Sequence, residues 1–126
     1  MKEVRKHYRI KGPPAEVYAA MTNPFSITLW TGADAVMKEE AGTEFSLFGG
    51  DVEGLNLEFE KDKKIVQEWY FGERNEKSIV TITLRPDRIH TRIELHQTNI
   101  PDEAFEDMLH GWDNYYFGGL KDFFEK

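Results

Sequence analysis

Cysteine is absent from the 126 residues of this chain. A chain without cysteine forms no disulfide bond, and it offers no thiolate as a metal ligand or as a nucleophile. Three kinds of chemistry are therefore excluded together.

Long apolar stretches are missing as well, since no run approaches the roughly 18 residues that a membrane-spanning helix needs. The first ten residues, MKEVRKHYRI, have neither the apolar segment nor the cleavage site of a secretory signal. We therefore expect a soluble, cytoplasmic protein with no membrane partner.

Positive charge is scarce: 16 Lys and Arg face 23 Asp and Glu, which gives a net charge of -7. Binding to a nucleic-acid backbone is driven by Lys and Arg that release counterions, so this balance argues against a nucleic-acid partner. The basic residues gather in the first strand-like segment, around Arg5 and Arg9, whereas acids dominate the last helix. Such a distribution can steer a protein partner.

The residue clusters that hold metals and cofactors are also lacking. The four histidines form no helical His-Glu-x-x-His pattern. The glycine-rich segment 49–54 carries two carboxylates and no lysine, so it is typical of a hairpin and not of a phosphate-binding loop. His110 and Asp113 are three residues apart and can meet on a helix, most simply as a surface pair. We expect no metal, no cofactor and no enzymatic activity.

Hydrophobic residues make up 40% of the chain, which is enough for one core. The length suits a single domain over residues 1–126. Alternation predicts a strand over Val4–Ile10. Two short helices are expected next: Ala15–Met21, which begins at a proline and ends at Asn23-Pro24, and Phe25–Trp30, which stops at Gly32. The remaining predicted strands are a weak one at Ala33–Lys38, then Glu44–Phe48, Leu55–Phe59, Ile65–Phe71, Val80–Leu84 and Ile89–Gln97. Short turns make the later strands antiparallel.

The last quarter of the chain, Pro101–Lys126, has apolar residues at steps of three, one and four, which predicts one long amphipathic helix. Pro101 suits a helix start, and acidic residues follow it at the positive end of the helix dipole. Gly111, Gly118 and Gly119 weaken helicity, so we expect them to admit a close approach of another backbone. The alternative is that the helix ends early at Gly118.

Aromatic and apolar side chains of this helix and of the sheet are candidates for lining a pocket between the two. The same side chains would equally fill a core. The residues considered for either role are Tyr8, Trp69, Phe105, Met108, Trp112, Tyr116 and Leu120.

Three stretches give the sequence a recognisable character: FSLFGGDVEG at 45–54, IVQEWYF at 65–71 and GWDNYYFGGLK at 111–121. With the order strand, two short helices, strands and long helix, they resemble the C-terminal domain of activators of the 90-kDa heat-shock protein ATPase. The resemblance covers essentially the whole chain. It implies an α+β helix-grip fold of the birch-pollen-allergen and steroidogenic-acute-regulatory-like superfamily, with a curved antiparallel sheet of about seven strands wrapped around a long C-terminal helix.

The resemblance implies no catalytic residues, and the N-terminal domain of two-domain activators is not part of this sequence. The first hypothesis is therefore a stand-alone, non-catalytic co-chaperone or protein-interaction module that acts on a heat-shock protein 90 type chaperone. The alternative is a binding protein for a small hydrophobic ligand, held in a cavity between the sheet and the C-terminal helix.

Overall fold

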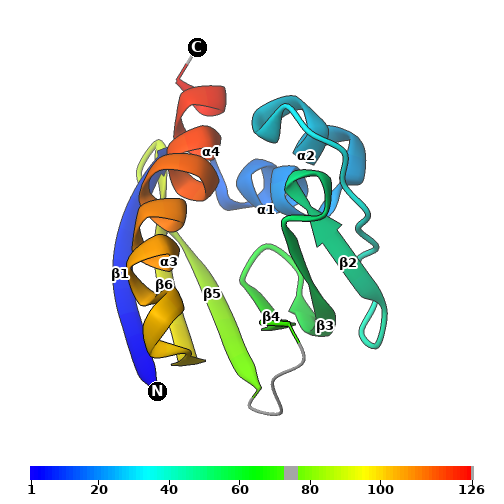
Figure 1. Cartoon of the computed structure of the whole chain (residues 1–126). Coiled ribbons are helices and arrows are strands. Elements are labelled where there is room, and N and C mark those ends of the chain that lie inside the picture. Colours follow the sequence, from blue (N-terminus) through cyan, green and yellow to red (C-terminus); the bar gives the residue numbers. More distant parts are fainter. Residues whose placement is uncertain (73–76, 126) are drawn as a thin grey trace.

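The computed structural model describes residues 1–72 and 77–125. In this part of the chain six strands form one antiparallel sheet in the order β1-β6-β5-β4-β3-β2 (Figure 1). The strands are β1 (Lys2–Lys11), β2 (Glu44–Leu47), β3 (Val52–Glu60), β4 (Lys64–Trp69), β5 (Ser78–Asp87) and β6 (His90–Ile100). The predicted α+β arrangement of a sheet that curves around a C-terminal helix is confirmed (Figure 1).

The sheet has one buried and one exposed face, as the alternation of its strands requires. On the inner face Ile82 lies opposite Leu95, and Leu84 lies opposite Ile93. All four side chains are at most 3% exposed. The core therefore lies between this face and the helices.

Two short helices, α1 (Pro14–Thr22) and α2 (Pro24–Thr31), join β1 to β2 as predicted. Asn23 separates them, and its side chain accepts a hydrogen bond from the Ser26 backbone N–H at 3.1 Å, which caps α2. Gly32 ends α2 in the left-handed conformation, with φ of 72°. Both helices lie at the end of the molecule that α4 (Phe117–Phe124) also occupies (Figure 1).

The weak strand expected at Ala33–Lys38 is not a strand, which accounts for six strands in place of about seven. Only Val36 pairs, with Ser46, through two backbone hydrogen bonds of 2.8 and 2.9 Å. Val36 is 63% exposed, so pairing there buries too little apolar surface to extend the ladder.

The C-terminal helix is continuous but not uniform. A 3₁₀ turn (Asp102–Ala104) leads into α3 (Phe105–Gly111), a π-helical turn (Trp112–Tyr116) and α4. The early end considered at Gly118 does not occur, because α4 runs on to Phe124. Lys126 lies outside the described residues.

The three glycines of this helix behave differently. A Cβ on Gly119 would lie 3.1 Å from the Trp30 carbonyl oxygen, so the close approach of a second backbone is found there. A Cβ on Gly118 would lie 2.5 Å from the Asp113 carbonyl oxygen of its own helix, and one on Gly111 would meet nothing within 4 Å. The expectation of close packing is wrong for Gly111, which borders open space.

Candidate functional site

A cavity of about 530 Å³ opens between the C-terminal helix and the β3–β4 half of the sheet. Its wall comes from the turn before β3, from β3 and β4, and from α3 with the π-helical turn. The described residues that line it are Phe48, Asp51, Val52, Trp69, Asp107, Met108, Gly111, Trp112, Tyr115 and Tyr116. Aromatic and apolar side chains dominate this lining, as in most sites for small ligands.

Three aromatic rings form the buried part of the wall. The Trp69 and Trp112 rings stack with centroids 4.6 Å apart and an interplanar angle of 28°. Tyr116 packs against Trp112 at 4.8 Å. Exposures of 5%, 1% and 4% show that the rings are integral to the core as well as to the cavity. Core filling and pocket lining, which the sequence left as alternatives, are thus combined in the same residues.

Two buried glutamines fix the orientation of the indoles. The Trp112 N–H donates to Gln97 Oε1 at 2.8 Å, and the Trp69 N–H donates to Gln67 Oε1 at 3.0 Å. Gln67 in turn donates to Asn56 Oδ1 at 2.9 Å. Because buried polar groups are costly when unpaired, these bonds hold the indoles in one arrangement. Both indole donors are therefore already used within the protein.

The turn before β3 supplies a wall residue with an unusual backbone. Phe48 has φ of 55°, in the left-handed region that side chains rarely adopt, and Gly49 follows with φ of 67°. The predicted hairpin at 49–54 is present, since β2 pairs with β3 across it. What the sequence did not indicate is that the turn places Phe48 in the cavity wall.

The candidate residues named from the sequence divide into two groups. Trp69, Met108, Trp112 and Tyr116 line the cavity together. Tyr8, Phe105 and Leu120 do not line it.

Leu120 is fully buried in the core. Tyr8 stacks on Phe117 at a centroid distance of 4.3 Å. Phe105 lies at the N-terminal end of α3, where the Lys2 ammonium is 4.9 Å from its ring centroid.

Sequence reasoning missed several residues of the site. Gln97 continues the inward alternation of Ile93 and Leu95, so the sequence predicts its place on the buried face. It does not predict that Gln97 accepts a hydrogen bond from Trp112. Asp51 and Asp107 gave no signal, because an exposed carboxylate is ordinary in an acidic chain.

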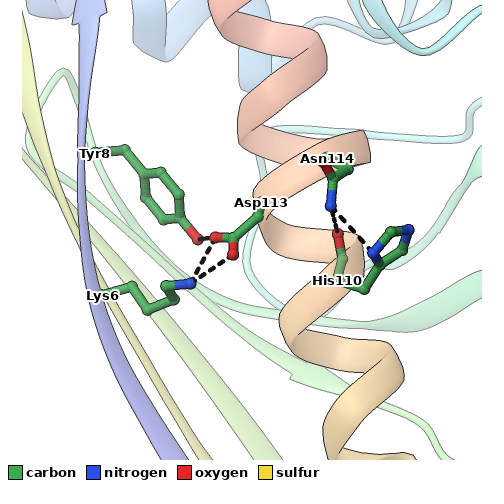
Figure 2. Close-up of polar contacts among 5 residues, drawn as sticks. All are labelled: Lys6, Tyr8, His110, Asp113 and Asn114. Carbon is green, nitrogen blue, oxygen red and sulfur yellow. Dashed lines mark hydrogen bonds and ion pairs between the residues drawn. The ribbon is translucent and has the colours of Figure 1, made fainter.

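A polar cluster fastens the π-helical turn to the edge strand β1 (Figure 2). The Lys6 ammonium lies 2.6 Å from both carboxylate oxygens of Asp113, and the Tyr8 hydroxyl donates to Asp113 Oδ1 at 2.8 Å. The hydrogen bond from Lys6 lowers the pKa of the Asp113 carboxyl below its ordinary value of 3.8. Burial, with the neighbouring Asp113, raises the pKa of Tyr8. The cluster thus positions the helix that covers the cavity.

His110 and Asp113 do not form the pair that their spacing suggested. Asp113 reaches toward β1, whereas His110 lies on the other side of the helix with Asn114 (Figure 2). The Asn114 amide donates to the His110 carbonyl oxygen at 3.0 Å and lies 3.1 Å from His110 Nδ1. Asp113 is bound by Lys6 and Tyr8 of β1, and His110 by Asn114, so the two side chains have different partners.

Within residues 1–72 and 77–125, no group of three or more His, Asp and Glu side chains is arranged to hold a metal ion. In the same ranges no helix is both long and apolar enough to cross a membrane.

The family model described as Activator of Hsp90 ATPase homolog 1-like protein matches residues 11–125. A curated relative from Dictyostelium discoideum, named Activator of 90 kDa heat shock protein ATPase homolog, is 32% identical over 111 residues, which are 86% of this chain and 29% of that protein. The Homo sapiens homolog 1 is 30% identical over 113 residues, 88% of this chain and 33% of that protein. The chain thus spans about a third of the length of these relatives.

Among solved structures, PFC0360w from Plasmodium falciparum, described as an HSP90 activator, superposes with a TM-score of 0.88 at 26% identity, covering 98% of this chain and 96% of that chain. The Aha1 dimer from Colwellia psychrerythraea has a TM-score of 0.83 at 16% identity, covering 99% and 97%, and supports the fold alone. On the family match over residues 11–125, the chain belongs to the Activator of Hsp90 ATPase homolog 1-like protein family.

Proposed function

We propose that the protein is a non-catalytic interaction module that binds a heat-shock protein 90 type chaperone and stimulates its ATPase. One observation carries this proposal: relatives at 30% and 32% identity, aligned over most of the chain, are named activators of that ATPase. The Plasmodium neighbour described as an HSP90 activator supports it further, because its chain is covered almost completely by this one. Such a role needs different affinities for two states of the chaperone and no catalytic group.

The exposed face of the sheet supplies a surface suited to this role. In the register of β1, β6 and β5, Arg9 lies opposite Arg92, and Arg92 lies opposite Arg85. All three side chains are exposed. We call these three residues the arginine row.

The arginine row is only partly neutralised. The Arg9 Nε–H donates to Asp87 Oδ2 at 3.1 Å, but Arg85 and Arg92 form no ion pair with any residue in the described ranges. Like charges placed directly opposite one another destabilise a sheet. An acidic surface on a protein partner would remove this repulsion. It would also speed the approach of the two proteins.

The test is to titrate the protein into the host's own 90-kDa chaperone and to follow ATP hydrolysis. We expect stimulation by the wild type, and about tenfold weaker apparent affinity for the double variant Arg85→Glu/Arg92→Glu. Lys121→Glu changes charge by the same amount per residue at an exposed position of α4 and serves as the control. Thermal unfolding checks that each variant is folded.

The two results answer separate questions. No stimulation by wild-type protein would refute the chaperone role. Stimulation that the arginine variant retains in full would refute the docking surface but not the role. Rising salt should reduce the association rate of the wild type and leave that of the arginine variant nearly unchanged.

The second candidate function is binding of a small hydrophobic ligand, and the cavity beside Trp112 favours it. Because Gly111 lines this cavity and a Cβ there meets nothing within 4 Å, Gly111→Leu should place its side chain in the cavity. Apolar probes should raise the melting temperature of the wild type but not that of Gly111→Leu. Equal shifts for both proteins would place the binding elsewhere.

A further inference from the structure

The charged groups in the cavity wall have one sign. Among the described lining residues only Asp51 and Asp107 are of a charged type, and no Lys, Arg or His accompanies them. Both aspartates are exposed and form no ion pair with another described residue. A ligand held in this cavity therefore meets uncompensated negative charge.

The hydrogen-bonding groups of the wall favour a ligand that donates hydrogen bonds. The indole N–H donors of Trp69 and Trp112 are already satisfied by Gln67 and Gln97. Tyr116 is 4% exposed, and its hydroxyl makes no hydrogen bond to any residue within the described ranges. A carboxylate accepts hydrogen bonds only, and a hydroxyl can accept as well as donate. The open positions are thus mainly acceptors, which suit a ligand that donates.

The aromatic rings supply the third element. Phe48, Trp69, Trp112, Tyr115 and Tyr116 bring five rings to one cavity. The negative face of an aromatic ring attracts a cation. Trp69 and Trp112 stack on one another, so this attraction rests mainly on the other rings. A neutral apolar ligand would use the area of these rings but not their electrostatic preference.

We propose that the cavity binds a small organic cation, an amine on an apolar body, with the ammonium directed to Asp51, Asp107 and the Tyr116 hydroxyl. This inference rests on the second candidate function and names its ligand class. An apolar carboxylate of the same size would be repelled by the two aspartates and would find no basic partner among the described lining residues.

The test compares three probes of equal shape: phenylpropylamine, phenylpropanol and phenylpropionate. Two of the three tryptophans line the cavity, so quenching of intrinsic fluorescence reports binding directly. We expect the amine to bind about tenfold more tightly than the alcohol, and the carboxylate to bind most weakly. The advantage of the amine should shrink as salt rises, because the aspartates are exposed.

Variants locate the charge effect. Asp51→Asn and Asp107→Asn should each reduce the ratio of amine to alcohol affinity about threefold, because the amine loses more than the alcohol. Asp122→Asn removes the same charge from an exposed position of α4, away from the cavity lining, and should leave the ratio unchanged.

The possible outcomes distinguish failure of the cation proposal from failure of ligand binding in the cavity. Equal affinities for amine and alcohol, or an unchanged ratio in both aspartate variants, would overturn the cation proposal and leave a cavity for neutral apolar ligands. No binding of any probe would overturn the cavity function along with it. Amine binding that persists in Gly111→Leu would also overturn the proposal, because the cation would then sit outside the cavity.

Discussion

The two halves of the C-terminal helix differ in what lies beneath them. Under α4 the packing is tight: Phe117 stacks on Tyr8, Leu120 is fully buried, and Gly119 lies against the Trp30 carbonyl. No residue of α3 is fully buried, and Met108 and Gly111 border the cavity. One continuous helix therefore serves as an anchor at one end and as a cover at the other.

This difference shows how a small domain can keep an open site and a stable core together. The apolar surface buried under α4 stabilises the fold, so α3 is free to lie over space that packing would otherwise fill. The Lys6–Tyr8–Asp113 cluster sits at the boundary and ties the helix to β1 where the packing changes.

The largest expected effect contrasts one side chain from each half. Leu120→Ala removes a fully buried side chain and should lower the free energy of unfolding by about 2–5 kcal/mol. Met108→Ala removes a partly buried side chain beside an existing cavity and should cost about 1 kcal/mol. Urea denaturation of both variants measures the difference. Equal costs would show that the two halves pack alike.

Alanine substitutions at two glycines of the helix should change the stability of the protein by smaller amounts and in opposite directions. Gly118→Ala places a Cβ 2.5 Å from a backbone oxygen, so the helix must shift and the protein should lose about 1–3 kcal/mol. Gly111→Ala meets nothing within 4 Å and should gain about 0.5–1 kcal/mol from helix propensity. Melting temperatures that move in the same direction for both would contradict the comparison.

The smallest effect concerns the boundary cluster. Lys6→Met removes the partner of a half-exposed carboxylate and should cost about 0.5–1 kcal/mol near neutral pH. Because the pKa of Asp113 is lowered in the folded protein, this stabilisation is present above the ordinary value of 3.8 and is lost as pH falls through the folded pKa. Wild type and variant should therefore converge in stability once the pH is below the folded pKa of Asp113. A gap that persists in acid would assign the cost to lost packing of the lysine stem, and Lys121→Met provides the unpaired control.

Much of the fold was readable because its signals are local. The alternation through Ile93 and Leu95, the proline that opens α1, and the stripe on the last helix each depend on neighbours in sequence. The prediction of a strand at Ala33–Lys38 was wrong. Strand pairing depends on the neighbouring strand, and the sequence of one segment does not show which residues that strand places opposite it.

The candidate site was only partly readable, for the same reason. Trp112 and Tyr116 lie on the helix stripe, but whether a buried aromatic borders a cavity depends on side chains from β3, β4 and the turn at Phe48. Tyr8 carries the same apolar signal as Trp69, yet it packs on Phe117 outside the cavity. The indole partners Gln67 and Gln97 become visible only when strands and helix are placed together.

The π-helical turn has a consequence for the register of the whole helix. Its closing bond runs from the Phe117 N–H to the Trp112 carbonyl, one residue further than in an α-helix. A π-helical turn accommodates one extra residue locally, so deleting one residue of this turn would restore α geometry and leave α3 and α4 in nearly the same relative orientation. Met108 and Gly111 would stay at the cavity and Leu120 in the core, whereas side chains of the turn itself would be displaced. The π-helical turn thus lets the helix carry one additional residue between its covering and its anchoring segment.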